Sequence, residues 1–288
     1  MKKDELKDNV KSMIKTMSEG DFVSHLGAVA LFRHYSLFNR MSILLHKPDA
    51  MCVMGYKGWQ KIGRYVKRDE NGIPVLVPST RKVYKNKDGK TIRRDTLKKL
   101  DIKKELADGN IIYAGKKKEF IVGYVFDITQ TGGNPVPEIL GGLRGDVKNV
   151  NFSKAIKVCK ELTGYDIEVK KDVGMLGAKG YCDKENKKIV IRELEKGQML
   201  KTLLHEVGHA MVANDKIKVG GRADEEIVAE GVAYTVCKGL GYDTSKYTLD
   251  YIKSWYRVAK DIEQDINIIV EISDKVLNVL VGEVQIRL

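Results

Sequence analysis

The sequence has few cysteines, no C-x-x-C pair and no long apolar run. Its four cysteines are scattered at Cys52, Cys159, Cys182 and Cys237. This spacing disfavours both a disulfide scaffold and a cysteine-ligated zinc site, so a reducing cytoplasm is the expected setting. No run of about 18 apolar residues predicts a transmembrane helix, and the charged N-terminus lacks the apolar core of a secretory signal. We therefore expect a cytoplasmic protein without membrane contact.

Histidine is also scarce, yet two of the five histidines stand four residues apart in "LLHEVGHAM". On a helix, His205 and His209 project from one face toward one ion. Glu206 stands beside the first histidine, where its carboxylate can reach a metal-bound water. The flanking apolar residues would bury the rest of the helix, and Gly208 leaves room for a neighbouring strand or substrate. In a chain with so few histidines, this pattern favours a zinc site over coincidence.

A catalytic zinc ion needs a third protein ligand and an open position. The segment "ADEEIVAEGVAY" offers Glu226 and Glu230, which are four residues apart and share one helix face. We expect Glu226 to ligate zinc and Glu230 to hydrogen-bond a ligand histidine, with the reverse assignment as the alternative. An ordinary acidic first turn would also explain Asp224 and Glu225, but Glu230 lies among apolar residues.

These residues predict a zinc-dependent metallopeptidase that binds one zinc ion. Zinc-activated water would hydrolyse a peptide bond, with Glu206 as the general base. The strand "KKIVI", just before the histidine helix, is a plausible edge for pairing with an extended protein or peptide substrate.

The net charge of +12 is confined to one half of the chain. Residues 1–150 contain 29 Lys and Arg against 17 Asp and Glu, whereas residues 151–288 contain 22 of each. Residues 81–118 are the most basic part, with 14 Lys and Arg against 5 acidic residues. This asymmetry indicates two parts with different partners, the basic one facing a polyanion.

Aromatic residues are interleaved with the basic ones, at Tyr56, Trp59, Tyr65, Tyr84 and Tyr113. Cations can follow phosphates while aromatic faces stack on bases, so the pattern is typical of single-stranded nucleic-acid binding. A solvated basic surface is the alternative. The residues expected to contact nucleic acid are Trp59, Lys61, Arg64, Lys67, Arg81, Lys82, Arg93 and Arg94.

The order of elements predicts an α+β protein of two domains. Residues 4–45 show helical periodicity, and strand patterns follow at 72–78 and 119–131. In the second half we expect a helix ending at Gly164, a hairpin over 178–193, the histidine helix, a helix from about Asp224, and C-terminal helices over 247–282. The Gly- and Pro-rich stretch 132–146 is the predicted boundary, giving a basic domain over 1–140 and a metallopeptidase domain over 147–288.

The stretches "YSLFNRMSILLHKPDAMCVMGYKGWQKIGRYVKRDENGIPVLVP" and "VGYVFDITQTGG" resemble the N-terminal domain of ArdC-like antirestriction proteins. In that family this domain binds single-stranded DNA. "GYCDKENKKIVI", "LLHEVGHAM" and "EEIVAEGVAYTVCKGLGYDTSKYTLDYIKSW" resemble its zincin-like metallopeptidase domain, akin to the ImmA/IrrE peptidases. The resemblance implies a protein of a conjugative or other mobile element, with a bilobed α+β architecture. It also implies a metal motif at His205, His209 and the Glu226 region, with Glu206 as the base.

Three functions follow from these observations. The first is a DNA-binding zinc metallopeptidase of a mobile element, in which a small sheet packs on the active-site helix. The second is an antirestriction protein that binds single-stranded DNA and holds a structural or non-proteolytic zinc ion. The third is an ImmA-like regulator protease that cleaves a repressor.

Overall fold

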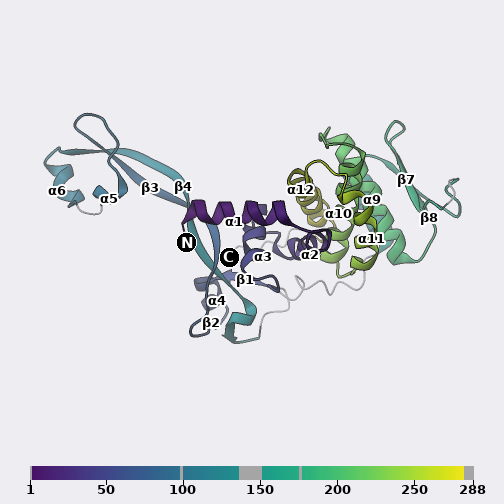
Figure 1. The fold of residues 1–288 in the computed structure, drawn as a ribbon, viewed down its shortest axis with the longest axis horizontal. Coiled ribbons are helices and arrows are strands. Elements are labelled where there is room, and N and C mark those ends of the chain that lie inside the picture. The colour runs from purple at the N-terminus through teal and green to yellow at the C-terminus, as the bar shows by residue number, and fades with distance from the viewer. Residues whose placement is uncertain (1, 98–99, 136–150, 175–176, 282–288) are drawn as a thin grey trace.

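The computed structural model describes residues 2–97, 100–135, 151–174 and 177–281, and it forms an elongated mixed fold of helices and strands (Figure 1). The predicted boundary at 132–146 lies largely outside the described residues. The first half contains these elements: α1 (Lys3–Thr16), α2 (Glu19–Val29), η1 (Ala30–Phe32), α3 (Leu37–His46), β1 (Val53–Gly55), α4 (Tyr56–Lys61), β2 (Arg64–Val66), β3 (Ile73–Asn86), α5 (Arg94–Leu97), α6 (Ile102–Ala107), β4 (Ile111–Asp127), η2 (Ile128–Gln130) and β5 (Thr131–Gly133).

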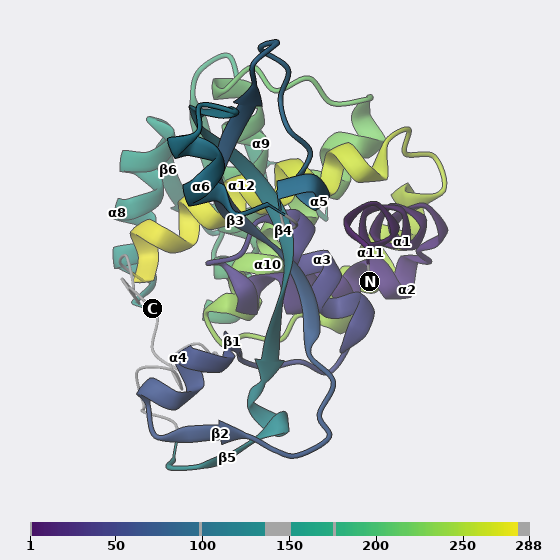
Figure 2. The same ribbon diagram turned by 90° about the vertical axis from the view of Figure 1, so that its left-hand side faces the viewer.

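Strands β3 and β4 form a long two-stranded arm that projects from the body, with α5 and α6 at its far end (Figure 1). They pair antiparallel from Ile73 opposite Val125 to Asn86 opposite Ile111, with one register shift between Val83 and Tyr84. β1 pairs with β4 at the root of the arm, giving the sheet order β1-β4-β3. The short strands β2 and β5 pair separately and lie with α4 beside that root (Figure 2).

Helix α3 attaches the arm to the body. The Asn39 side chain exchanges two hydrogen bonds of 2.8 Å with the backbone of Leu76, and the Ser42 hydroxyl donates to the Pro74 carbonyl at 2.7 Å. At the root of the arm, the outer edge of β3 has no strand partner among the described residues. The side chains of Asn39 and Ser42 bond its backbone groups instead, and this holds the root against α3.

The second half contains α8 (Phe152–Thr163), β6 (Asp166–Lys170), β7 (Gly180–Asp183), β8 (Lys188–Arg192), α9 (Lys196–Asn214), α10 (Arg222–Gly239), α11 (Ser245–Tyr256) and α12 (Ile262–Val281). Helix α8 ends at Gly164, as predicted, because its φ of 69° is the left-handed C-cap conformation that favours glycine. The hairpin, the histidine helix and the helix after it also form where the sequence predicts them. No helix in the described part of the chain is long and apolar enough to cross a membrane.

One hydrophobic core joins the two halves. It contains Leu26 of α2 and Ile43 of α3 together with Ile227 of α10 and Ile269 of α12, all nearly fully buried. Across this junction the guanidinium of Arg40, 3% exposed, forms an ion pair with Asp274 of α12 and donates to backbone carbonyls of the α2–α3 segment. Helices α1–α3 therefore pack on the second half, although the predicted division places them in the first domain. The division itself stays a prediction.

Candidate metal centre

Helix α9 presents His205 and His209 on one face, one turn apart. Their Nε2 atoms lie 3.2 Å from each other and both rings are largely buried. The opposite faces of the helix are buried by the apolar residues that the sequence singled out: Leu203, Leu204, Val207, Ala210, Met211 and Val212. Burial on these faces fixes the rotation of the helix, so the two imidazoles are directed to one point.

Helix α10 crosses α9 at Gly208. A Cβ atom at this position would lie 2.8 Å from the Cα of Ala229, a separation that real Cβ atoms essentially never show. The sequence prediction gave this space to a strand or a substrate, whereas the structure fills it with α10. The close contact is what brings the acidic residues of α10 within reach of the histidines.

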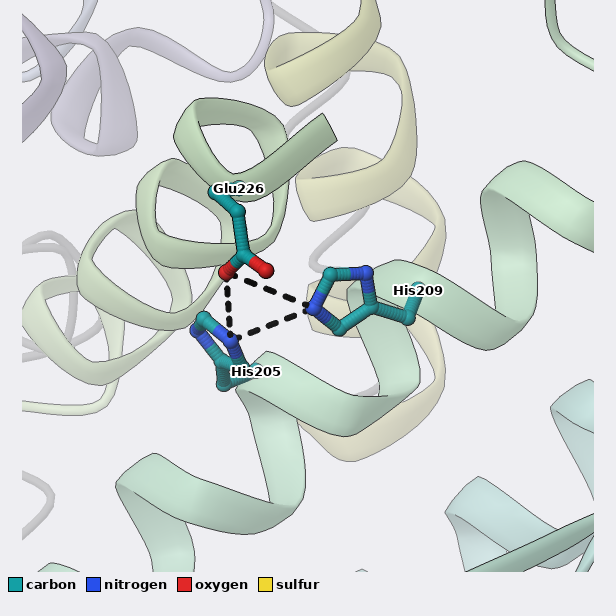
Figure 3. Close-up of side chains that lie close together, drawn as sticks. All are labelled: His205, His209 and Glu226. Atoms are coloured by element: carbon teal, nitrogen blue, oxygen red, sulfur yellow. Dashed lines mark hydrogen bonds and ion pairs between the residues drawn. The ribbon is translucent and has the colours of Figure 1, made fainter. Parts of the chain in front are cut away.

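Glu226 of α10 completes a cluster of three ligand atoms (Figure 3). Its Oε2 lies 3.6 Å from Nε2 of His205 and 3.8 Å from Nε2 of His209, and the three atoms lie within 4.8 Å of one another. Two imidazole nitrogens and one carboxylate oxygen form a donor set for zinc and similar divalent ions, with a position left for water or substrate. The structure thus brings together the three residues expected to bind the metal.

Each histidine also contacts a second glutamate through its other ring nitrogen. His205 Nδ1 lies 3.3 Å from Oε2 of Glu230, and His209 Nδ1 lies 2.7 Å from Oε1 of Glu225. When Nδ1 of each ring donates to its carboxylate, both Nε2 lone pairs face the carboxylate of Glu226. Three electron-rich atoms directed at one point require a positive charge between them, so the arrangement fits a cation.

Two lysines form ion pairs with the carboxylates that contact the Nδ1 atoms of the histidines. Lys201 Nζ lies 2.6 Å from Oε1 of Glu230, and Lys184 Nζ lies 2.5 Å from Oε1 of Glu225. The sequence predicted a contact between Glu230 and a histidine but assigned Glu225 to an ordinary acidic first turn. Glu225 was missed because its partner His209 lies on another helix, and adjacent Glu225 and Glu226 project in different directions from α10.

The carboxylates around the histidines favour their charged forms. Hydrogen bonding from His209 lowers the pKa of Glu225 to about 2, and hydrogen bonding from His205 lowers the pKa of Glu226 to about 2. For His205, burial is the largest single influence and favours the neutral ring. The bonds to Glu226 and Glu230 outweigh it and raise the pKa to about 9. The centre therefore attracts positive charge, whether a proton or a metal ion.

The carboxylate of Glu206, also on α9, lies next to β7. Glu206 is 7% exposed, and its Oε1 lies 3.3 Å from the position that a Cβ atom on Gly180 would occupy. Burial raises the pKa of this carboxyl above its ordinary value. Glu206 contributes no atom to the three-ligand cluster, so it is free to serve as a base.

The histidines and Glu206 open into a cleft of about 830 Å³. Strand β7 and helices α9, α10 and α11 line it, with Tyr181, Thr202, Arg222, Tyr247 and Tyr251 among the lining residues. Tyr251, which the sequence did not single out, donates a 2.7 Å hydrogen bond to Oε2 of Glu226. This hydroxyl therefore bonds the oxygen atom of the ligand cluster from the cleft side.

The sheet beside the cleft differs from the predicted arrangement. Its order is β6-β8-β7, so β8, the strand expected to be a free edge, is paired on both sides. Within the described residues the edge nearest the cleft is β7, which pairs with β8 alone. An extended peptide could add to β7 but not to β8.

Among the residues expected to contact nucleic acid, Trp59 is in the core. Its ring is fully buried, and its Nε1 donates to the Phe126 carbonyl at 2.9 Å. This burial does not fit the expectation that Trp59 stacks on bases. Arg64 already has partners within the protein. Its guanidinium lies over the Trp59 ring at 5.8 Å, and its Nε donates to the Thr131 hydroxyl at 2.9 Å.

The other predicted contacts are on the surface. Lys61, Lys67, Lys82 and Arg93 are exposed, Arg81 pairs with Glu119 at 3.0 Å, and the side chain of Arg94 lies outside the described residues. The structure therefore does not gather these residues into one patch but distributes them between the α4 region and the arm.

Comparison with known proteins finds a family model that matches part of the first half of the chain. Residues 5–119 match the model of the N-terminal domain of anti-restriction factor ArdC. This match confirms the predicted resemblance for these residues. The resemblance of the second half to ImmA/IrrE peptidases stays a prediction.

The chain is also similar to one curated protein and to solved ArdC structures. It is 25% identical over 285 residues to an uncharacterized protein of Bacillus anthracis, covering 86% of this chain and 45% of that protein, so it spans less than half of its relative. The metal-free crystal structure of the antirestriction protein ArdC from plasmid R388 superposes with a TM-score of 0.51 at 17% identity, covering 86% and 85% of the two chains. An Mn(II)-bound structure of that protein gives 0.48 at 18% identity, covering 92% and 100%. The first superposition shows a shared fold.

Proposed function

We propose that this protein is an antirestriction protein that binds single-stranded DNA through its N-terminal half. The match of residues 5–119 to the ArdC N-terminal domain carries this proposal. These residues contain most of the basic half of the chain, including residues 81–118 with their 14 Lys and Arg. A polyanion is the partner that such a charge distribution favours.

The binding test is a titration of labelled single-stranded DNA with the full chain at several salt concentrations. We expect affinity to fall steeply with salt, because lysines that contact phosphates release bound counterions. The functional test is transfer of unmodified plasmid DNA into cells that contain a restriction enzyme, with and without the protein. Absence of both DNA binding and protection would contradict the proposal.

A second activity is favoured by the position of Glu206. We propose that the centre is a metal-dependent hydrolase of peptide bonds, because a buried base, three metal ligands and a free strand edge meet in one cleft. A divalent ion held by His205, His209 and Glu226 would lower the pKa of water and polarise a carbonyl group.

The residues of the chain would act around that ion. Glu206 accepts a proton from the attacking water and passes it to the leaving amine, and its raised pKa brings it closer to neutral pH, where such transfer is efficient. Glu225 and Glu230 hold the histidine rings so that Nε2 of each faces the ion. The β7 edge would orient an extended peptide along the cleft.

Glu206→Gln separates catalysis from metal binding. The amide keeps the shape of the side chain but cannot accept the proton, so we expect unchanged metal content and DNA affinity with loss of any peptidase activity on a peptide library. If plasmid protection is lost in parallel, hydrolysis serves antirestriction. If protection is fully retained, the metal has a structural role and DNA binding suffices. Retained peptide cleavage by the variant would contradict the role of Glu206.

A further inference from the structure

The two faces of the β3–β4 arm differ in what they expose. Successive residues of a strand alternate between faces, and paired residues share a face. At the root, the face that contains Ile73, Val75 and Val125 is buried in the core. The opposite face contains these cross-strand pairs in order toward the tip: Pro74 and Tyr124, Leu76 and Val122, Pro78 and Phe120, Thr80 and Lys118, Lys82 and Lys116.

This opposite face exposes two aromatic rings. Tyr124 is 50% exposed and Phe120 is 55% exposed, whereas Val125 on the other face is buried. They are four residues apart on β4 and therefore point the same way, roughly 14 Å from each other along the strand. Exposed apolar side chains that gather on one face and are bordered by polar residues are typical of an interaction site.

Three lysines extend the same face toward the tip. Lys82 stands directly opposite Lys116, and Lys118 follows on the Phe120 side; all three are exposed. Like charges directly opposite each other destabilise a strand pair. None of the three forms an ion pair within the described residues, whereas on the other face Arg81 is paired with Glu119 at 3.0 Å. Three lysines that form no ion pair in the described part of the chain thus lie on the face that also exposes the rings.

We propose that this face, defined by Phe120, Tyr124, Lys82, Lys116 and Lys118 and here named the stacking face, is where single-stranded DNA binds. Bases stack on the two rings while the lysines contact the phosphates. A duplex presents no free base face to the rings, so the face selects single strands. This inference rests on the proposed DNA binding and locates it on one side of the arm.

The test compares two oligonucleotides, an oligothymidylate and an abasic strand of the same length. Both carry phosphates, but only the first can stack. We expect the full chain to bind oligothymidylate more tightly. The double variant Phe120→Ala/Tyr124→Ala should lose roughly 10- to 100-fold affinity for oligothymidylate and bind the two strands alike. Tyr65→Ala, which removes an exposed ring from β2 outside the stacking face, is the matched control and should behave as the wild type.

The lysines are tested by the salt dependence of binding. Replacing Lys82, Lys116 and Lys118 by Gln should lower the slope of log affinity against log salt by about 2, since each phosphate contact on a single strand contributes about 0.7. Lys117→Gln is the control on the opposite face and should leave the salt slope unchanged. All substituted side chains are exposed, and thermal unfolding checks that each variant is folded.

Three outcomes would overturn the inference in distinguishable ways. If the wild type binds DNA and the double aromatic variant binds it equally well, the stacking face is wrong while DNA binding stands. If the wild type binds neither strand, the proposed function and this inference both fail. A dimer that becomes monomeric in the aromatic variant, with DNA affinity unchanged, would assign the face to a second copy of the chain instead.

Discussion

The candidate metal centre and the arm differ in how their charged side chains are paired. In the centre, each imidazole has a carboxylate partner and each of those carboxylates has a lysine, all on packed helices or next to them. On the stacking face, lysines stand side by side without acidic partners. A compact ion requires ligands fixed in place, whereas a flexible polymer requires an accessible row of charges and rings.

The two regions are nevertheless parts of one packed body. Helix α3 holds the root of the arm through Asn39 and Ser42, and it reaches α12 through the Arg40–Asp274 ion pair. Helix α2 packs against α10, where a Cβ atom on Gly27 would collide with the hydroxyl of Tyr234. The two candidate sites therefore share one core, and we expect a substitution in one site to leave binding at the other site unchanged.

The largest expected effect is on stability at the root of the arm. Trp59→Ala should lower the free energy of unfolding by about 3–5 kcal/mol, because it removes a fully buried ring and its hydrogen bond. Tyr65→Ala, at an exposed ring nearby, should change it by less than about 0.5 kcal/mol. Urea denaturation measures both. Normal stability of Trp59→Ala with weakened DNA binding would restore the direct stacking role that its burial argues against.

Next in size is the loss of a metal ligand. His205→Ala should weaken zinc or manganese binding by at least about 100-fold. Removing a residue that only hydrogen-bonds a metal ligand weakens binding by up to about 100-fold, and removing the ligand itself should weaken it at least as much. Calorimetric titration of the purified protein measures this, and His25→Ala in α2 serves as the matched control. DNA affinity should not change in either variant. A His205→Ala protein that still binds one equivalent of metal at wild-type affinity would exclude the proposed ligand set.

A smaller effect is expected when a ligand partner is removed. Glu225→Ala should weaken metal binding by about 10- to 100-fold, because His209 loses the carboxylate that orients its ring. Glu225→Gln should recover part of the loss, since its amide oxygen can still accept the Nδ1–H bond. Glu185→Ala, at an exposed acidic residue of the β7–β8 turn, should have no effect. Equal metal affinity of all three variants would show that Glu225 is an ordinary surface charge.

The smallest effect concerns Asp265, a buried acid of α12 that lies near Asp224 at the start of α10. Burial, together with the neighbouring Asp224 and Asp261 carboxylates, raises the pKa of Asp265 from 3.8 to about 8. Between pH 3.8 and about pH 8, the carboxyl of Asp265 is protonated in the folded protein and ionised in the unfolded chain. The free energy of unfolding therefore falls as the pH rises through this range. Asp265→Asn should remove this loss and gain on the order of 1 kcal/mol above pH 8. Urea denaturation at acidic and alkaline pH checks this, and a variant with the same pH slope as the wild type would refute it.

Local sequence patterns predicted the elements of the second half well. Glycine at the end of α8, the turn of the β7–β8 hairpin and the spacing of His205 and His209 are short-range signals that act within one element or one turn. Glu226 could be predicted because a carboxylate near the start of the next helix can complete a donor set of two histidines. Glu230 was recognised because a carboxylate among apolar residues needs a partner.

The remaining features depend on contacts between distant segments. The length of the arm follows from pairing of residues 73–86 with 111–127, and neither strand reveals its partner by periodicity. Whether β7 or β8 is the edge depends on the parallel pairing of β6 with β8. The burial of Trp59 and the exposure of Tyr124 depend on where α4 packs, so composition could not show which ring is available for stacking.

One crystal structure of the full chain, grown with zinc and a short oligothymidylate and recorded with anomalous scattering at the zinc edge, tests most directly whether metal and DNA bind at separate sites. We predict a single anomalous peak bonded to Nε2 of His205, Nε2 of His209 and the carboxylate of Glu226. We also predict the oligonucleotide along the arm, with bases on Phe120 and Tyr124. An ion bound by other residues, or a strand bound in the cleft beside the ion, would contradict the separation of the two sites.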